Sequence, residues 1–262
     1  LTLGFLAYEK EALDTAEVQR AELYARVLQD HAERTFNTVD IALASLADIV
    51  EGDAHPADAA SLARTLTQAL HGLPFLRSLS LMDPGGHVLA SSGAGNIGVS
   101  VDLSRVKPPL GAATDALGTS IAGRDLVDAA VDRAPAAPGI HTFVPLVRVI
   151  GPEAGPRSYL VAVLNPDFFA NDHELTLADS TRNAALLSTG GVMLSATGGL
   201  RKVPGESAAA HRFLTDFFPA RESGSFIGNG NDGTKVVTAF RVLRKRPVMV
   251  VVERSYANLV ET

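Results

Sequence analysis

Residues suited to binding a small ligand are gathered in the first β-rich part of the chain. Arg124 and Asp125 stand next to each other, and the strand-like segments after them carry His141, Phe143 and Tyr159. A guanidinium offers two parallel donors to a carboxylate, and an aromatic wall excludes water from the contact. These five residues are therefore predicted to form the binding site for a small carboxylate or an amino acid.

Each of these residues also has an ordinary structural explanation. Arg124 and Asp125 can form an ion pair within a loop. Tyr159 suits a hydrophobic core, and His141 suits the surface of a strand. Arg105, another arginine of this part of the chain, has no stronger claim to a ligand. The sequence leaves both explanations open.

No motif for catalysis or metal binding is readable in the sequence. The seven histidines do not form the close pairs that place two imidazoles on one metal, and no cysteine can supply a thiolate. His173 and Glu174 lack the second histidine of a metalloprotease helix, and neither a Gly-x-Ser-x-Gly elbow nor a Walker loop occurs. We therefore predict no catalytic residue, no metal and no cofactor. A hydrolase whose carboxylates meet only in the folded chain remains an alternative.

Two segments, 93–98 and 228–233, match the pattern Gly-x-Gly-x-x-Gly. In dinucleotide-binding folds this pattern holds a pyrophosphate where a helix begins. Both segments here lead into extended, strand-like residues instead. They are predicted to be a loop and a hairpin turn.

The composition excludes several classes of partner. The net charge is −6 and the pI is near 5.6, so the excess of Lys and Arg that a phosphate backbone requires is absent, and no nucleic-acid partner is predicted. The longest apolar runs fall short of the roughly 18 to 20 residues that cross a bilayer. The apolar opening, Leu1–Ala7, is typical either of the last turns of a truncated membrane helix or of an ordinary domain start.

A long helix is predicted from Tyr8 to Val50, because this stretch contains no proline or glycine and is rich in helix formers. The apolar stripe of its second half, expected to cover the chain's own sheets, consists of Ala32, Phe36, Val39, Leu43, Leu46 and Val50. The thinner seam of its first half consists of Leu13, Val18, Leu23 and Val27. A helix of this size is on the order of 60 Å long, so it should support more than one module. The thin seam is expected to contact a second copy of the chain.

After a second helix at Asp58–His71, the pattern changes to strands. A hairpin at Leu79–Ala90 resembles a later one at Ala184–Ser195, with equivalent residues 105 positions apart. Further strands are predicted at 142–149, 158–164, 235–242 and 248–252. In each half the last strand runs into a helix, at Asn165 and at Ser255. The sequence therefore predicts two copies of one β-rich plan.

The order of these segments resembles the double Cache sensor domains found outside the membrane in bacterial diguanylate cyclases, histidine kinases and chemoreceptors. Besides the long helix, the resemblance is carried by Leu79–Ser92, Gly139–Arg148, Ser223–Phe226, Asp232–Thr234, Pro247–Val252 and the helix after Ser255. It covers nearly the whole chain, although no single motif is diagnostic.

The resemblance implies an α+β fold in which a long N-terminal helix carries two PAS-like (Cache) modules with antiparallel sheets. It divides the chain into a helical spine (1–54), a membrane-distal module (55–168), a membrane-proximal module (169–252) and an exit helix toward the membrane (253–262). Ligands are expected in the distal module.

The implied function is that of an extracytoplasmic sensor domain on the periplasmic side of the bacterial inner membrane. The full-length protein would be a membrane-anchored receptor, a histidine kinase or diguanylate cyclase, and a homodimer through its N-terminal helix. This part of it is not expected to be an enzyme. A soluble solute-binding or scaffold protein without a membrane partner is the alternative.

One departure from the family bears on the ligand. Many members with amino-acid or carboxylate ligands have an Asp-Arg-Asp-Tyr-Phe-like stretch and a tryptophan or several tyrosines around the distal pocket. This chain has Asp102–Pro109 there and no tryptophan. The identity of a ligand therefore cannot be carried over.

Overall fold

The computed structural model describes residues 2–52, 58–133, 141–152, 155, 157–177, 181–200, 207, 214, 216, 218–230 and 233–256. The helices are α1 (Thr2–Gly52), α2 (Ala59–Leu70), α3 (Leu103–Val106) and α4 (Pro166–Leu177). Short 3-10 helices are η1 (Ala94–Asn96), η2 (Leu126–Ala129), η3 (Gly198–Leu200) and η5 (Phe218–Ala220). The strands are β1 (Leu76–Met82), β2 (Val88–Ser91), β3 (Asp115–Leu117), β4 (Ile121–Ala122), β5 (Thr142–Ile150), β6 (Ser158–Leu164), β7 (Arg182–Ser188), β8 (Met193–Ala196), β9 (Ser223–Asn229), β10 (Lys235–Val242) and β11 (Val248–Ser255).

Contacts divide the chain into two compact units. The central unit contains Arg34–Phe168. The terminal unit contains the described residues up to Glu33 and those from Phe169 onward. Helix α1 is continuous and contributes to both units, which confirms the predicted long N-terminal helix.

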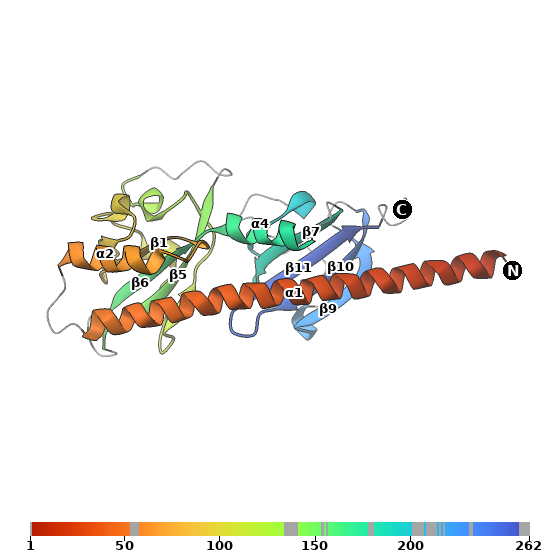
Figure 1. The fold of residues 1–262 in the computed structure, drawn as a ribbon, viewed down its shortest axis with the longest axis horizontal. Coiled ribbons are helices and arrows are strands. Elements are labelled where there is room, and N and C mark those ends of the chain that lie inside the picture. Colours follow the sequence, from red (N-terminus) through yellow and green to blue (C-terminus); the bar gives the residue numbers. More distant parts are fainter. Residues whose placement is uncertain are drawn as a thin grey trace. The chain divides into compact units, whose positions relative to one another are not determined.

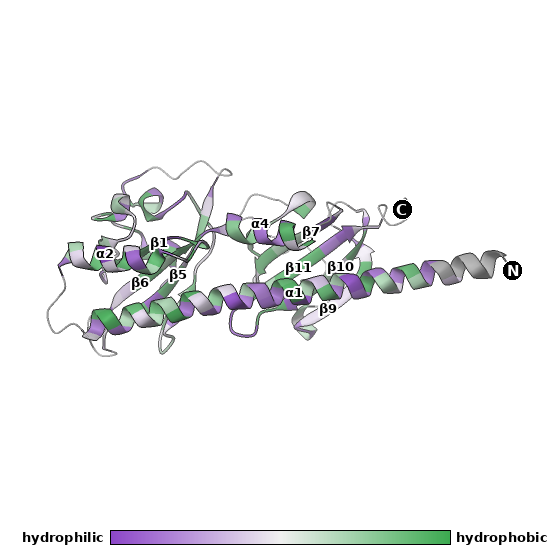
Figure 2. Cartoon of the chain, in the orientation of Figure 1, coloured by the Kyte–Doolittle hydropathy of each residue, from purple (hydrophilic) through white to green (hydrophobic). Residues whose placement is uncertain are grey.

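The first half of α1 corrects one expectation, because it also covers a sheet of its own chain. Its buried residues are Glu17, Ala21, Ala25, Leu28 and Gln29. Gln29 donates to the carbonyl oxygen of Val242 at 2.6 Å and accepts from Arg241 Nε at 2.7 Å, which anchors α1 on β10. Apart from Leu28, the buried face of this section is made of alanine and polar side chains, which carry little hydrophobic signal. Hydrophilic and hydrophobic residues alternate along the helix (Figure 2).

The central unit is built on an antiparallel sheet with the strand order β2-β1-β6-β5-β3, and β4 also pairs with β5 (Figure 1). Helix α2 packs against β1 and β2. It begins as predicted after Asp58, whose carboxylate caps the helix by accepting from Ser61 N. It ends before Gly72, whose φ of 89° suits glycine.

The terminal unit has an antiparallel sheet with the order β8-β7-β11-β10-β9. The order matches that of the central sheet when β7 is equated with β1, β11 with β6, and β10 with β5. Both sheets are antiparallel, so the α+β fold with two antiparallel modules is confirmed.

The two hairpins repeat each other at the level of single hydrogen bonds. Ser92 N donates to Leu79 O and, 105 residues later, Thr197 N donates to Ala184 O. The irregularity in pairing after Leu81 recurs at the equivalent position after Leu186. The turn glycines, Gly86 and Gly191, have φ values of 88° and 81°. Because side-chain, bulge and turn chemistry agree, the internal duplication inferred from sequence is a property of the fold.

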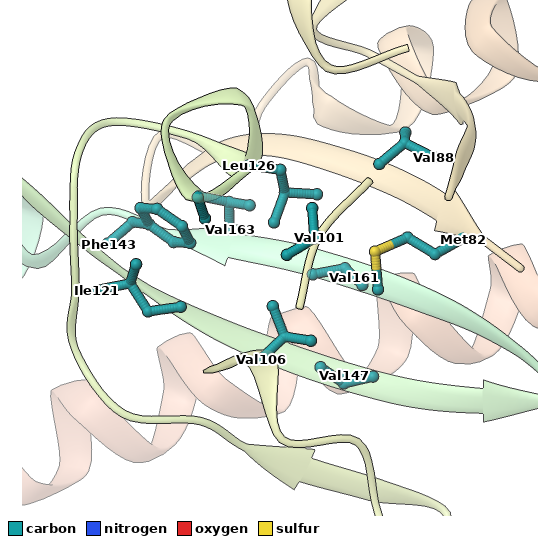
Figure 3. Close-up of a cluster of buried hydrophobic side chains, with 11 residues drawn as sticks. Met82, Val88, Val101, Val106, Ile121, Leu126, Phe143, Val147, Val161 and Val163 are labelled. Atoms are coloured by element: carbon teal, nitrogen blue, oxygen red, sulfur yellow. The ribbon is translucent and has the colours of Figure 1, made fainter. Parts of the chain in front are cut away.

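Each sheet has a hydrophobic cluster on one face. In the central unit the cluster, seen over β5 and β6 in Figure 3, contains Met82, Val88, Val101, Val106, Ile121, Leu126, Ala129, Phe143, Val147, Val161 and Val163. In the terminal unit it contains Ala185, Leu187, Met193, Ala196, Leu214, Phe240, Met249 and Val251. The alternation of residues along the strands sends these side chains to one face and leaves the other face for helices.

Some elements differ from the sequence-based expectation. Strands β3, β4 and β9 were not predicted, because two are very short and the third consists largely of glycine and polar residues. Strand β11 continues to Ser255 rather than ending at Val252, so the expected helix cannot begin at Ser255. The remainder of that predicted helix lies outside the described residues. The segment 93–98 contains η1, and Gly228 and Gly233 belong to the β9–β10 hairpin, so neither holds the start of a helix of the dinucleotide-binding kind.

Candidate functional site

Four of the five predicted site residues come together in the central unit, where β4 pairs with the start of β5. Ile121 is paired with Phe143, so the turn after β4 lies beside the beginning of β5. Arg124 is exposed, and its Nη1 lies 3.4 Å from Nε2 of the half-buried His141. The backbone N–H of Arg124 donates to Asp128 at 2.8 Å, which fixes the turn. A guanidinium and an imidazole therefore converge at the protein surface.

Asp125 is occupied by the protein itself. One of its carboxylate oxygens, Oδ1, accepts from Ser78 Oγ at 2.6 Å, from Asn96 Nδ2 at 2.8 Å and from Leu126 N at 2.8 Å. The last of these caps η2. Among the described residues Asp125 forms no ion pair with Arg124, so its role is to hold the turn on which Arg124 stands.

A buried polar network continues from Asp125 into the sheet. Asn96 is 1% exposed, and its Oδ1 accepts from Val127 N at 2.9 Å. Its Nδ2 also lies 3.3 Å from Ser91 Oγ, which is 2.8 Å from Ser80 Oγ. The network connects β1, β2, η1 and η2 behind the exposed turn. Sequence analysis missed it because its members are far apart in the chain.

Arg77 on β1 is a second residue that sequence analysis missed. Its Nη1 donates to the carbonyl oxygens of Thr142 at 2.7 Å and Arg124 at 3.2 Å. Its Nη2 donates to Asn165 Oδ1 at 2.8 Å and to Asp167 Oδ2 at 3.1 Å. Burial lowers the pKa of Arg77, while the charge of Asp167 acts in the opposite direction. Arg77 thus joins the Arg124 turn to the beginning of α4.

Phe143 and Tyr159 do not share one wall. Phe143 is fully buried in the hydrophobic cluster (Figure 3). Tyr159 packs at the edge of the same cluster but is paired with Val149, six residues further along β5, which corresponds to about 20 Å. Arg105 is equally separate, since its Nη1 donates to Ala129 O at 3.3 Å.

The sheet face beneath the turn is filled rather than hollow. The clustered side chains there are aliphatic apart from Phe143, and none of them carries a charge. A hollow of about 330 Å³ lies elsewhere in the central unit, lined by Gly111, Ala112, Ala113, Thr114, Val149, Gly151 and Arg157. None of the five predicted site residues lines it.

The described ranges offer no place for a metal ion, because no three His, Asp or Glu side chains in them are grouped closely enough. In the same part of the chain, no helix has both the length and the apolar character needed to span a bilayer.

The terminal unit has a charged cluster of a different kind on the face that contacts α1. Glu17 Oε2 accepts from Arg182 Nη2 at 2.7 Å and from Arg254 Nη1 at 2.9 Å, and all three side chains are buried or nearly so. Arg182 and Arg254 are direct cross-strand neighbours. Burial would raise the pKa of Glu17, but hydrogen bonds and charges from Arg254 and Arg182 hold it below its usual value. Two like charges placed opposite each other repel, so Glu17 is what allows this pair.

Comparison with known proteins gives the same fold. No protein-family model matches the sequence, and no curated protein matches it. Among solved structures, the extracellular domain of a protein described as a histidine kinase matches with a TM-score of 0.78 at 15% identity, covering 94% of this chain and 97% of that one. The periplasmic sensory domain of the Campylobacter jejuni chemoreceptor Tlp1 matches with a TM-score of 0.67 at 10% identity, covering 95% and 98%.

A third match is the ligand-binding domain of the Pseudomonas fluorescens chemoreceptor CtaA in complex with L-isoleucine, with a TM-score of 0.60 at 15% identity, covering 96% of each chain. The matched proteins are sensor domains rather than catalytic domains. Likeness at this level of identity concerns the fold. The chain has the double-module, Cache-like α+β fold of extracellular sensor domains from histidine kinases and chemoreceptors.

Proposed function

We propose that this chain is the extracytoplasmic sensor domain of a bacterial transmembrane signalling protein, acting by binding rather than by catalysis. The fold supports this function, because its matches over nearly their whole length are extracellular or periplasmic sensor domains. The matched proteins named here belong to histidine kinases and chemoreceptors. A diguanylate cyclase as the output domain stays a prediction.

We propose further that a small carboxylate, such as an amino acid, binds at the surface formed by Arg124 and His141. The observation that carries this proposal is the convergence of these two side chains, with the guanidinium exposed and 3.4 Å from the imidazole. Asp125 holds the turn through its hydrogen bond to Leu126 N, and Phe143 packs in the adjacent hydrophobic cluster. Tyr159 lies too far along the sheet to touch the same small ligand directly.

Structural neighbours make the ligand class reasonable. Structures of CtaA are complexes with L-isoleucine, L-alanine and L-serine, and that of the Campylobacter jejuni chemoreceptor Tlp3 is a complex with L-norvaline. All four ligands carry a carboxylate.

Arg77 connects the proposed ligand site to helix α4. It holds the Arg124 carbonyl with one nitrogen and Asp167, in the first turn of α4, with the other. A ligand that draws the Arg124 turn outward would change the balance of these contacts. Such a ligand could shift the equilibrium between the present arrangement of the turn and the moved one only if it binds the two with different affinities.

The proposed receptor is anchored in the inner membrane and acts as a homodimer through α1. Large hydrophobic side chains of α1 that are exposed in this chain support the contact: Tyr8, Leu13, Leu23, Ile41 and Ile49. These five side chains are spread along α1, so the apolar surface that they offer is too small to hold two subunits together in dilute solution. Membrane anchors would raise the effective concentration to about the millimolar range.

The proposed ligand site is tested by calorimetric titration with L-amino acids and small organic acids, using the Arg124→Ala variant. A bidentate contact contributes about 1.5 to 3 kcal/mol, so affinity for the best carboxylate ligand should fall about 10- to 150-fold. Thermal stability should stay unchanged because Arg124 is exposed. Arg64→Ala, which removes an exposed arginine from α2, is the matched control. Equal affinity of wild type and Arg124→Ala for a bound carboxylate would contradict the proposed site.

A further inference from the structure

His173 is a buried histidine in the terminal unit that the proposed ligand site does not involve. It lies in α4 and is 1% exposed. Its Nδ1 has no hydrogen-bond partner among the described residues. A histidine in such a place is held by packing and not by a polar contact at this nitrogen.

The surroundings of His173 favour the neutral ring. A neutral imidazole has one donor and one acceptor nitrogen, whereas the protonated ring has two donors, each of which needs an acceptor. Nδ1 faces no acceptor in the described structure, so a proton there would be buried without compensation. Burial accordingly lowers the pKa of His173 to about 4.

Helix α1 contacts α4 beside this residue. His31 Nδ1 of α1 lies 3.1 Å from Asp172 Oδ2 of α4, and both side chains are about one-third exposed. Asp172 and His31 are the two groups whose charges act on His173: the carboxylate raises its pKa, and His31 lowers it. His173 directly follows Asp172 in α4, so the buried ring lies next to the surface pair that joins α1 and α4 within the terminal unit.

We propose that His173 makes the contact between α1 and α4 responsive to acid. As the pH falls, protonation of the ring favours an arrangement in which α4 has moved away from α1 and the imidazolium reaches water. The effect has a defined sign. A group whose pKa is lower in the folded state stabilises that state fully above its unfolded pKa and loses the contribution as the pH falls toward the folded value.

The response would act on the helix that the proposed ligand site also reaches. Helix α4 begins at Pro166, and Asp167 in its first turn accepts from Arg77. Acid and ligand would thus act on opposite ends of one helix. The acid response itself does not depend on the presence of any ligand.

The first test follows the histidine directly, by NMR titration of wild-type protein with ring nuclei assigned through the His173→Leu variant. We expect the His173 signal to stay that of the neutral ring at pH 5. A midpoint at the ordinary value of about 6.5 in the folded protein would overturn the proposal. If the variant does not fold, assignment through backbone correlations of wild-type protein gives the same answer.

The second test compares unfolding at pH 7.5 and pH 5 for wild type, His173→Leu and the control His71→Gln, which changes an exposed histidine of the central unit. Shifting one pKa from about 6.5 to about 4 lowers the folding equilibrium constant about 30-fold between these two pH values. Wild type and His71→Gln should show this loss, and His173→Leu should lack it. An equal loss in all three proteins would contradict the proposal.

Hydrogen exchange locates the response. At pH 5, after correction for intrinsic exchange rates, the amides of α4 should lose more protection than those of α2. Equal loss in both helices would mean that acid weakens the whole fold and not the α1–α4 contact.

Discussion

The β1–β2 hairpin of the central unit and the β7–β8 hairpin of the terminal unit share their backbone hydrogen bonds, yet their equivalent arginines have different surroundings. Arg77 and Arg182 are 105 residues apart, at matching positions of β1 and β7. Arg182 is bound to the buried carboxylate of Glu17, with Arg254 on the same oxygen. Arg77 is bound mainly to carbonyl and amide oxygens, and its acidic partner, Asp167, is 64% exposed.

The two hairpins share one backbone plan, and the different surroundings of their arginines suggest a different role for each. A buried ion triad loses much when any partner leaves, so it fixes α1 on the terminal sheet. Contacts to carbonyl oxygens and to an exposed carboxylate cost less to rearrange, since water can replace them. We therefore expect the ion triad to hold α1 firmly on the terminal sheet and the Arg124 turn of the central unit to rearrange more easily.

The substitution Glu17→Gln is the strongest test of the difference between the two arginine sites. The substitution keeps the shape but removes the carboxylate charge that the two buried guanidinium groups share. We expect a loss of about 3 to 5 kcal/mol in the free energy of unfolding, measured by urea denaturation. The control Glu11→Gln changes an exposed carboxylate of the same helix and should have little effect. A wild-type midpoint for Glu17→Gln would show that the triad is not the anchor.

The same residue sets a pH dependence. Because the folded pKa of Glu17 is lowered from 4.5, its contribution is complete well above pH 4.5 and is lost as the pH falls below that value. Stability of the wild type should therefore fall more steeply below pH 4.5 than that of Glu17→Gln. This range overlaps the lower end of the window in which His173 is expected to act, so the Glu17 effect is taken from the difference between wild type and Glu17→Gln, both of which keep His173.

In the central unit the largest effect is expected from Asp125→Ala. It removes the cap of η2 and the carboxylate that accepts hydrogen bonds from Ser78 and Asn96, so we expect a loss of about 2 to 3 kcal/mol by denaturation. Asp102→Ala is the matched control, because Asp102 caps the short helix α3 at the surface. A loss no greater than that of Asp102→Ala would mean that the buried network contributes little.

Arg77→Lys should have a smaller effect, of about 1 to 2 kcal/mol, because an ammonium group can replace some but not all of the contacts of the planar guanidinium. Carbonyl oxygens in the Arg124 turn would lose their common donor, so hydrogen exchange should increase there and at the start of α4. Arg182→Lys should cost more if the comparison between the two arginines holds. Equal costs would remove the distinction between anchor and responsive turn.

The smallest effect concerns assembly. In dilute solution the chain should be mostly monomeric, and in the membrane-anchored protein Leu23→Cys should form a disulfide with its twin, because Leu23 is 59% exposed on α1. Leu89→Cys on β2 is the control, since Leu89 is also exposed but belongs to a hairpin. Cross-linking from Leu89→Cys alone would show that α1 is not the dimer axis.

Local patterns in the sequence determined much of this fold. The absence of glycine and proline predicts α1, the change from helical to alternating periodicity predicts the hairpins, and a constant offset reveals the duplication. These features depend on neighbouring residues, whose spacing decides which face they share. The long helix and the two β-rich copies could therefore be predicted from local patterns, whereas the fold class was implied by the resemblance of their order to a known family.

The candidate site could be predicted only in part. Arg124, Asp125, His141 and Phe143 are near one another because β4 pairs with the start of β5, although residues 123–141 separate the two strands in the chain. Tyr159 was grouped with them by residue type, but strand register places it far along the sheet. Register depends on the whole sheet and is invisible in one short segment.

Only the tertiary structure decided the partners of the buried charges. Glu17 lies among charged residues of α1 and gives no sign that it will be buried, since its partners Arg182 and Arg254 follow more than 160 residues later. The sequence around His173 likewise gives no sign of burial, because the packing that buries its ring is set by the fold. A sequence states which side chains can carry charge, but burial sets the energetic cost of that charge, and burial is a property of contacts between distant parts of the chain.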